Sequence, residues 1–154
     1  MDIFEQKRLL ILARKYPDRA ESCHRLVMET IEGGSTSSLS ETSDNLGQNL
    51  LMLLVMFDAP VGAIEALVAK CPEMARGASL LDATALTMAI CKKNSDAVRM
   101  LAESSDWDWK SSDGVGPCDM VSTPLEQSLM EHGIISSAGG FREKKTAVMT
   151  VRSI

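Results

Sequence analysis

The residues best suited to chemistry are four cysteines and two histidines, because a thiolate beside an imidazole is a common catalytic nucleophile. The only adjacent pair is Cys23 with His24, and neighbouring side chains on a helix point about 100° apart. Nothing in the sequence brings His132 to a cysteine. The pattern therefore predicts no cysteine–histidine catalytic pair, and we do not expect an enzyme.

The cysteine spacing also argues against a zinc site. Cys23, Cys71, Cys91 and Cys118 lie far apart in the sequence, without the close pairs that zinc ligands form. Cys71 and Cys91 lie in apolar helical patterns, where a free thiol acts as a small apolar side chain. We expect reduced cysteines, no metal, and a cytoplasmic protein, with the nucleus as the other option. The sequence leaves the redox state of Cys23 and Cys118 open.

Acidic and glycine-rich segments lack the spacing of known ligand sites. The aspartates between residues 106 and 119 do not form a calcium loop, because Lys110 occupies the third ligand position and the glycine spacing fails. The pairs Gly33-Gly34 and Gly139-Gly140 have no GxGxxG form and no lysine placed for a phosphate. We therefore expect no cofactor.

Two tryptophans stand out as candidate binding residues. Trp107 and Trp109 alternate with Asp106 and Asp108, and in an extended loop both indoles would face the same side. Tryptophan is enriched among the residues that dominate protein interfaces. These four residues are the predicted partner-binding site, with both indoles exposed. The alternative is that one or both indoles pack on a neighbouring part of the protein.

Composition places the chain among ordinary globular proteins of one domain. It has 154 residues, 45% of them hydrophobic, and a net charge of −5. Sixteen basic against 21 acidic residues argue against nucleic-acid binding. The longest apolar run, residues 50–57, is too short for a membrane span of about 20 residues. The acidic start does not resemble an export signal. Ten methionines and only six aromatic residues favour packed helices.

Apolar spacing and helix-end signals predict the elements that carry these residues. The expected helices span residues 3–16, 20–32, 48–57, 61–70, 84–92, 96–104 and 123–132. Ser95 and Thr123 are the predicted caps of the last two. The segment 33–45 is almost entirely small and polar, which predicts a flexible linker.

The apolar positions of these helices recur at regular intervals. Leu51 and Leu54 match Leu86 and Ala89, and Ile64 and Leu67 match Val98 and Leu101. The segment that begins at Thr84 matches the one that begins at Thr123, and the helix 3–16 matches the helix 61–70. Pairs of short helices that repeat in this way are typical of a solenoid.

The chain resembles the ankyrin repeat family over residues 46–133. Thr84-Ala85-Leu86-Thr87-Met88-Ala89 and Thr123-Pro124-Leu125-Glu126-Gln127-Ser128 are similar to the Thr-Pro-Leu-His-x-Ala motif of that family, and the connector ending in Asp113-Gly114 is similar to its hairpin loop. The family histidine is replaced in each unit, and residues 17–46 and 115–122 are expected to be insertions. The resemblance implies an all-α fold, a short degenerate ankyrin-like helical solenoid. The alternative is an irregular helical bundle.

Charge and repeats together divide the chain into four parts. They are an N-terminal helical cap region (1–32), a flexible linker (33–45), ankyrin-like repeats (46–133) and a basic tail (134–154). Residues 33–140 carry a net charge of −8, and residues 141–154 carry +3. An acidic surface favours a partner with a basic segment.

The function that follows from these expectations is non-catalytic protein–protein interaction, as an adaptor or scaffold that binds a protein through the repeat surface. One alternative is an obligate regulatory or structural subunit of a larger complex. Another is a helical-bundle enzyme. The sequence leaves the partner and the oligomeric state open.

Overall fold

The computed structural model describes residues 2–131, and this part of the chain is mostly helical, which confirms the expected all-α class. The α-helices are α1 (Ile3–Lys15), α2 (Ala20–Gly33), α3 (Thr36–Ser40), α4 (Leu50–Met56), α5 (Val61–Lys70), α6 (Ala85–Cys91), α7 (Ser95–Leu101), α8 (Pro117–Met120) and α9 (Thr123–Glu131). Two 3₁₀ turns, η1 (Pro17–Arg19) and η2 (Pro72–Arg76), follow α1 and α5. Within residues 2–131 the extended structure is limited to an isolated antiparallel bridge between Ala78 and Thr84.

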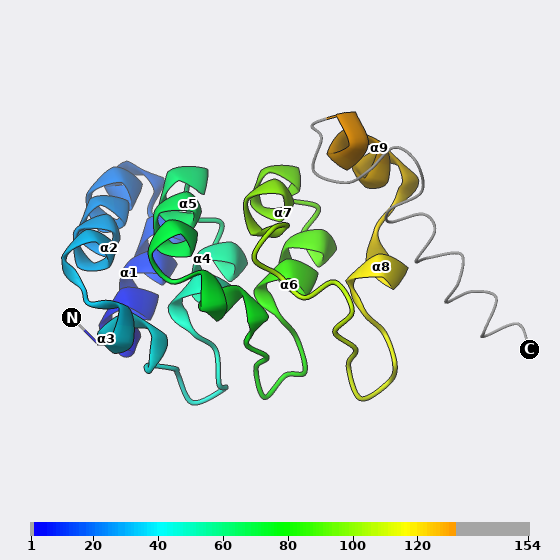
Figure 1. The fold of residues 1–154 in the computed structure, drawn as a ribbon. Helices are drawn as coiled ribbons and strands as arrows, with labels where there is room; N and C mark the ends of the chain where they lie inside the picture. Colours follow the sequence, from blue (N-terminus) through cyan, green and yellow to red (C-terminus); the bar gives the residue numbers. More distant parts are fainter. Residues whose placement is uncertain (1, 132–154) are drawn as a thin grey trace, which may run out of the picture.

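The helices pack in two rows (Figure 1). One row contains α1, α4, α6 and α8, and the other contains α2, α5 and α7. The consecutive pairs α1–α2, α4–α5 and α6–α7 are helix hairpins that join the rows. The loops that precede α4, α6 and α8 all leave the rows on the same side of the molecule (Figure 1). The result is a stack of helix hairpins with a line of loops along one edge.

Side-chain caps begin α4 and α6 of the first row. The Asn49 side chain accepts a hydrogen bond from the Met52 amide at the start of α4 (3.0 Å). The Thr84 hydroxyl accepts one from the Thr87 amide at the start of α6 (3.2 Å). Each bond satisfies an amide that has no partner inside its helix. The step from Asn49 to Thr84 equals the step from Leu51 to Leu86, so the caps recur with the apolar positions.

The turns between the two helices of a hairpin are also alike. Asp58 follows α4 and Lys93 follows α6, with φ angles of 56° and 57°. The amide that follows each of them donates to the carbonyl five residues earlier, at 2.9 and 3.0 Å. This geometry corrects the predicted cap of α7. Ser95 is the first helical residue, and Asn94 in its non-helical conformation presents the side-chain oxygen that accepts from the Ala97 amide (3.1 Å).

Three loops contain the same tight turn. The turns span residues 44–48, 79–83 and 111–115. In each, the first amide donates to the carbonyl four residues later, at 3.0, 2.9 and 2.8 Å. The fourth residue has a positive φ, 71° at Gly47, 60° at Asp82 and 79° at Gly114. Glycine and aspartate are among the residues that tolerate this conformation, so the turn signal at Asp113-Gly114 is explained.

The third turn corrects the predicted register of the last unit. The step from Asp82 to Gly114 equals the step from Ala85, which begins α6, to Pro117, which begins α8. The predicted match of the α6 segment to the helix at Thr123 is therefore wrong. Residues 115–122, expected to be an insertion, contain α8, which packs against α6. Proline suits the first turn of α8 as well as that of α9, and the contact with α6 decides between the two helices.

The segment 33–45 is not the linker that its composition predicts. It contains α3, and the Ser35 hydroxyl caps this helix by accepting from the Ser38 amide (3.1 Å). Leu39 of α3 is buried in the common core, and Asp44 is buried in the first loop turn. The buried leucine and the buried carboxylate anchor a stretch of otherwise polar residues.

The N-terminal region 1–32 contributes α1 and α2, which extend the two rows by one hairpin. The predicted similarity between α1 and α5 is found at the ends of the two helices. Tyr16 and Cys71 donate their amides to the carbonyl four residues earlier (2.8 Å each), and a proline then opens a 3₁₀ turn. The rows differ, however, because α1 packs beside α4 while α5 lies in the second row.

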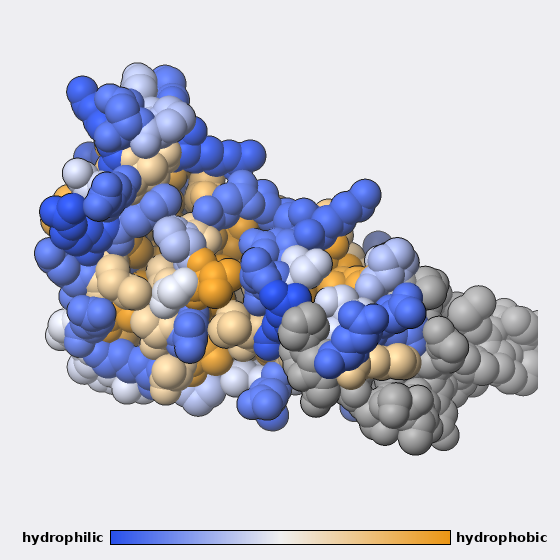
Figure 2. Space-filling view, turned by 90° about the horizontal axis from the view of Figure 1, so that it is seen from above, coloured by the Kyte–Doolittle hydropathy of each residue, from blue (hydrophilic) through white to orange (hydrophobic). Residues whose placement is uncertain are grey.

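The core is aliphatic and runs through both rows. Every residue of α4 from Leu50 to Val55 is buried, because α1, α5 and α6 surround this helix. Figure 2 shows apolar patches bordered by hydrophilic residues on the face seen from above the view of Figure 1. The predicted basic tail, 134–154, lies outside the described residues.

Candidate partner-binding site

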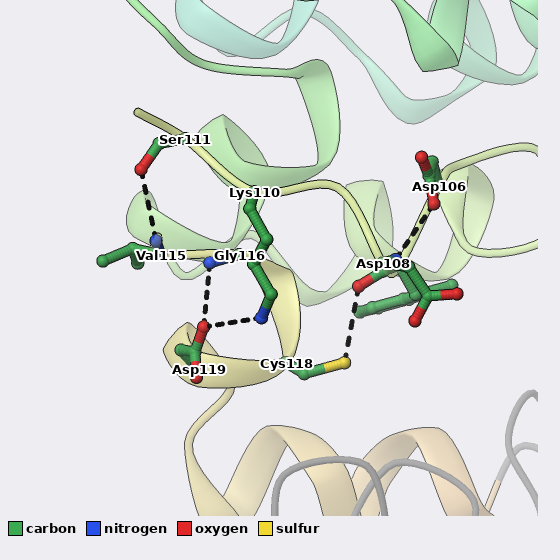
Figure 3. Close-up of polar contacts among 9 residues, drawn as sticks. Asp106, Asp108, Lys110, Ser111, Val115, Gly116, Cys118 and Asp119 are labelled. Atoms are coloured by element: carbon green, nitrogen blue, oxygen red, sulfur yellow. Dashed lines mark hydrogen bonds and ion pairs between the residues drawn. The ribbon is translucent and has the colours of Figure 1, made fainter. Parts of the chain in front are cut away.

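The connector between α7 and α8 folds as a series of turns. The amide of Trp109 donates to the Asp106 carbonyl (3.3 Å), and the amide of Asp108 donates to the Asp106 carboxylate (3.0 Å; Figure 3). The prediction of an extended loop with both indoles on one side is therefore wrong. The turn places Trp107 and Trp109 in different surroundings.

Trp107 packs inward. Its indole N–H donates to the carbonyl of Ala102 at the end of α7 (2.8 Å), and the half-buried ring lies against the core. Its carbonyl accepts a hydrogen bond from the Cys118 thiol of α8 (3.5 Å; Figure 3). The prediction of an exposed Trp107 is therefore wrong, because its indole tethers the connector to α7.

Trp109 is half-buried and lines a groove of about 460 Å³. The groove lies between α6, α8, the end of α4, and the second and third loops. Its apolar lining consists of Met56, Ala83, Met88, Cys91, Trp109, Val115 and Met120. The polar residues that line it are Asp82, Thr87, Lys92 and Ser111. Trp109 thus lies on one wall of an apolar groove and is not a fully exposed anchor.

Gly116 allows the third loop to lie close to α8. A β-carbon at Gly116 would stand 2.3 Å from the carbonyl oxygen of Trp109, which leaves no room for a side chain. The Asp119 carboxylate accepts from the Gly116 amide (2.9 Å) and pairs with Lys110 (3.1 Å; Figure 3). These contacts hold the backbone that follows Trp109 close to α8, and so help to fix where its ring enters the groove.

Asp106 and Asp108 are exposed and do not line the groove. Asp106 instead shapes the turn that presents Trp109. The structure therefore brings Trp109 together with side chains that the sequence-based prediction missed, above all Met88 and Met120. The step between these two methionines equals the step between the second and third loop turns, and that spacing was the available signal.

Neighbouring loops are joined along the edge of the molecule. The Leu80 amide donates to the Leu46 carbonyl (2.9 Å), and both the amide and the hydroxyl of Ser112 donate to the Asp82 carboxylate (2.7 Å each). The hydroxyl and amide bonds from Ser112 hold the pKa of Asp82 below its usual range. The wall of the groove formed by the second and third loops is therefore preorganised, with a carboxylate that is ionised at neutral pH.

The remaining candidates for chemistry stay apart. All four cysteines are free thiols, of which Cys71 is buried and Cys91 is exposed on the groove. Burial raises the pKa of the Cys71 thiol, and burial lowers the pKa of His24. Among residues 2–131 no group of three or more histidine, cysteine, aspartate or glutamate side chains is arranged to hold a metal ion. His132 lies outside the described residues.

Comparisons of the chain with protein-family models, with curated proteins and with solved structures give no match. In the part of the chain that the structure describes, no helix combines the length and apolarity needed to cross a membrane.

Proposed function

We propose that this chain is a non-catalytic, ankyrin-like adaptor that binds a protein partner through the groove at Trp109. The observation that carries the proposal is the groove itself, an apolar hollow with Trp109, Met88 and Met120 in its lining. Half-buried tryptophan in the wall of a hollow is typical of residues that dominate binding energy. Methionine side chains adapt to the shape of an incoming partner.

The ankyrin-like part of the proposal rests on recurrence. The cap and the start of the first helix, together with the left-handed turn residue, recur at one interval between the α4–α5 and α6–α7 hairpins. The loop turn occurs three times, with Gly47, Asp82 and Gly114 at the equivalent position. Stacked units of this kind, each burying its apolar face against the next, are the physical basis of a solenoid. In such an array, the loops and the first helix of each hairpin offer one continuous binding surface.

The test compares proteins captured by the full chain and by groove variants. Trp109→Ala removes the indole ring, and Met88→Lys places a charge in the apolar lining. We expect both variants to lose the same captured proteins, with affinity reduced about 30-fold for a loss of about 2 kcal/mol. Quantitative mass spectrometry after affinity purification measures this.

A matched control changes an exposed apolar residue far from the groove in sequence and in fold. Leu26 on α2 is 42% exposed and does not line the groove, so Leu26→Ala should retain every groove-dependent protein. Circular dichroism of each variant checks that the helices persist. Equal recovery of the same proteins by wild type, Trp109→Ala and Met88→Lys would contradict the proposal.

A further inference from the structure

The two charged side chains that line the groove at Trp109, Asp82 and Lys92, are not equally available to an occupant. Lys92 is already engaged, because its ammonium lies 3.2 Å from the Asp58 carboxylate and 2.9 Å from the Met56 carbonyl. Asp82 accepts two hydrogen bonds from Ser112 but makes no ion pair with a cation in the described part of the chain. The charge that the groove can still offer an occupant is therefore negative.

The part of the chain that follows α6 is also mostly acidic, so it adds to the negative charge near the groove. Residues 94–131 contain eight acidic and two basic side chains, a net charge of −6. Both basic residues are already paired, Arg99 with Asp96 and Lys110 with Asp119. A basic occupant is favoured by such a field, which raises its rate of encounter and disfavours acidic competitors. An occupant that suits the groove combines basic side chains with apolar ones.

The chain itself contains a segment of this chemistry. Residues 141–154 carry four basic residues and one acidic residue, a net charge of +3. The apolar side chains that accompany them are Phe141, Ala147, Val148, Met149, Val151 and Ile154. The preceding stretch, 132–140, differs in that it contains no lysine, arginine, aspartate or glutamate. The basic and apolar side chains are thus concentrated together in residues 141–154.

The distance along the chain permits the contact. Helix α9 ends at Glu131, and nine residues separate it from Phe141. Nine residues span up to about 30 Å when extended. Met120 in the groove lining ends α8, and two residues separate it from the start of α9, a helix of nine residues that is about 14 Å long. The extended tether is therefore long enough to run back along α9 toward the groove. A tether of this length corresponds to an effective concentration of the order of millimolar.

We propose that residues 141–154 occupy the Trp109 groove and compete there with the external partner. The apolar side chains enter the space between Met88, Met120 and Trp109, and a basic side chain approaches Asp82. This inference rests on the proposed function, since it assigns a regulator to the same site. An intramolecular occupant of modest intrinsic affinity is enough to raise the concentration of partner needed for binding.

The primary experiment uses a fluorescent synthetic peptide of residues 141–154 as the probe. The receptor is the full chain with Lys144→Glu and Lys145→Glu, which weaken its own segment. We expect saturable binding measured by fluorescence anisotropy, at least 10-fold tighter than to the wild-type chain, whose groove is already occupied. A peptide of the same composition in scrambled order should bind at least 10-fold more weakly. No binding of the native peptide, or equal binding of the scrambled one, overturns the proposal.

Groove variants locate the site of binding. Trp109→Ala and Asp82→Asn, each added to the receptor, should weaken binding of the peptide at least fivefold. Leu26→Ala, added in the same way, should leave the binding unchanged. Asparagine is chosen because it keeps an acceptor oxygen and tolerates the left-handed conformation of Asp82. Peptide binding that is unaffected by both groove variants shows a different site and overturns the proposal.

The two proposals fail in distinguishable ways. If Trp109-dependent proteins are captured equally well with and without Lys144→Glu and Lys145→Glu, the groove binds a partner but residues 141–154 do not regulate it. If those two changes raise capture at least threefold, the regulatory contact is supported. Concentration-dependent dimers that disappear with the same two changes would instead assign the groove to the segment of a second copy, and would overturn the intramolecular proposal.

Discussion

Lys7 of α1 and Asp44 of the first loop form an ion pair that joins the N-terminal hairpin to the line of loops, with 3.0 Å between Nζ and Oδ2. The Asp44 carboxylate is buried and also accepts hydrogen bonds from the amides of Leu46 and Gln48 (2.9 and 2.8 Å). Burial alone would raise the pKa of Asp44, but the bonds from Gln48, Lys7 and Leu46 outweigh it and hold the pKa below its ordinary value. The ionised form therefore stabilises the fold.

This carboxylate should make stability depend on pH in the acid range. Because its pKa is lower in the folded state, the stabilisation is complete above the unfolded-state pKa of about 3.9 and is lost as the pH falls through the folded-state value. Asp44→Asn should cost about 1–2 kcal/mol at pH 7, and the cost should shrink progressively as the pH falls below the unfolded-state pKa. Urea unfolding at pH 7 and at a series of lower pH values measures the difference. A constant difference between wild type and variant across this range would contradict the assignment.

Gly116 and Gly62 should respond in opposite ways to alanine. Gly116→Ala places a methyl group against the Trp109 carbonyl and should destabilise the chain by about 1–3 kcal/mol while moving the indole. Gly62 lies in α5, and apart from its chain neighbours and the backbone of its own helix no atom lies within 4 Å of the place that a β-carbon would take. Gly62→Ala should therefore stabilise by about 0.5–1 kcal/mol. Thermal unfolding compares the two, and tryptophan fluorescence reports the indole. Equal shifts in melting temperature would refute the packing argument.

Trp107 should matter for stability and not for partner binding. Trp107→Phe keeps an aromatic ring but removes the N–H that donates to Ala102, so we expect a loss of about 1 kcal/mol. Trp109→Ala should show the reverse pattern, with weak effects on unfolding and a strong effect on partner capture. Paired measurements of chemical unfolding and capture separate the two roles. Loss of capture in Trp107→Phe at unchanged stability would restore Trp107 as a binding residue.

Lys70 of α5 should stabilise the fold through its contact with the end of α2. Its ammonium donates to the Ile31 and Glu32 carbonyls at the end of α2 (2.9 and 2.8 Å), where the partial negative charge of the helix end favours a cation. Lys70→Met preserves the apolar stem and should cost about 1–2 kcal/mol. Arg8→Met, at an exposed position in the middle of α1, is the control and should change stability by less than about 0.5 kcal/mol. Equal effects of the two changes in urea unfolding would contradict this role.

Much of the helical framework follows from the sequence alone. The boundaries of α5 match the prediction, and those of α1, α2, α4 and α6 lie within two residues of it. Apolar spacing and proline positions act locally, so they can be recognised without knowing what packs against them. The turn at Asp113-Gly114 was predictable for the same reason, because the positive φ of Gly114 is a property of the turn itself.

Interactions between neighbours along the chain thus account for the helices, the predominantly aliphatic core and the turn before the last unit. Contacts between distant residues decide that α8 rather than α9 makes the main contact with α6, that residues 36–40 form a helix, and that Trp109 and not Trp107 lines the groove. The groove, for example, needs Trp109 beside Met56 and Met88, which come from two other units of the stack. Periodicity shows that a side chain is apolar and on one face of its helix, but the packing of the rows selects the partner it meets.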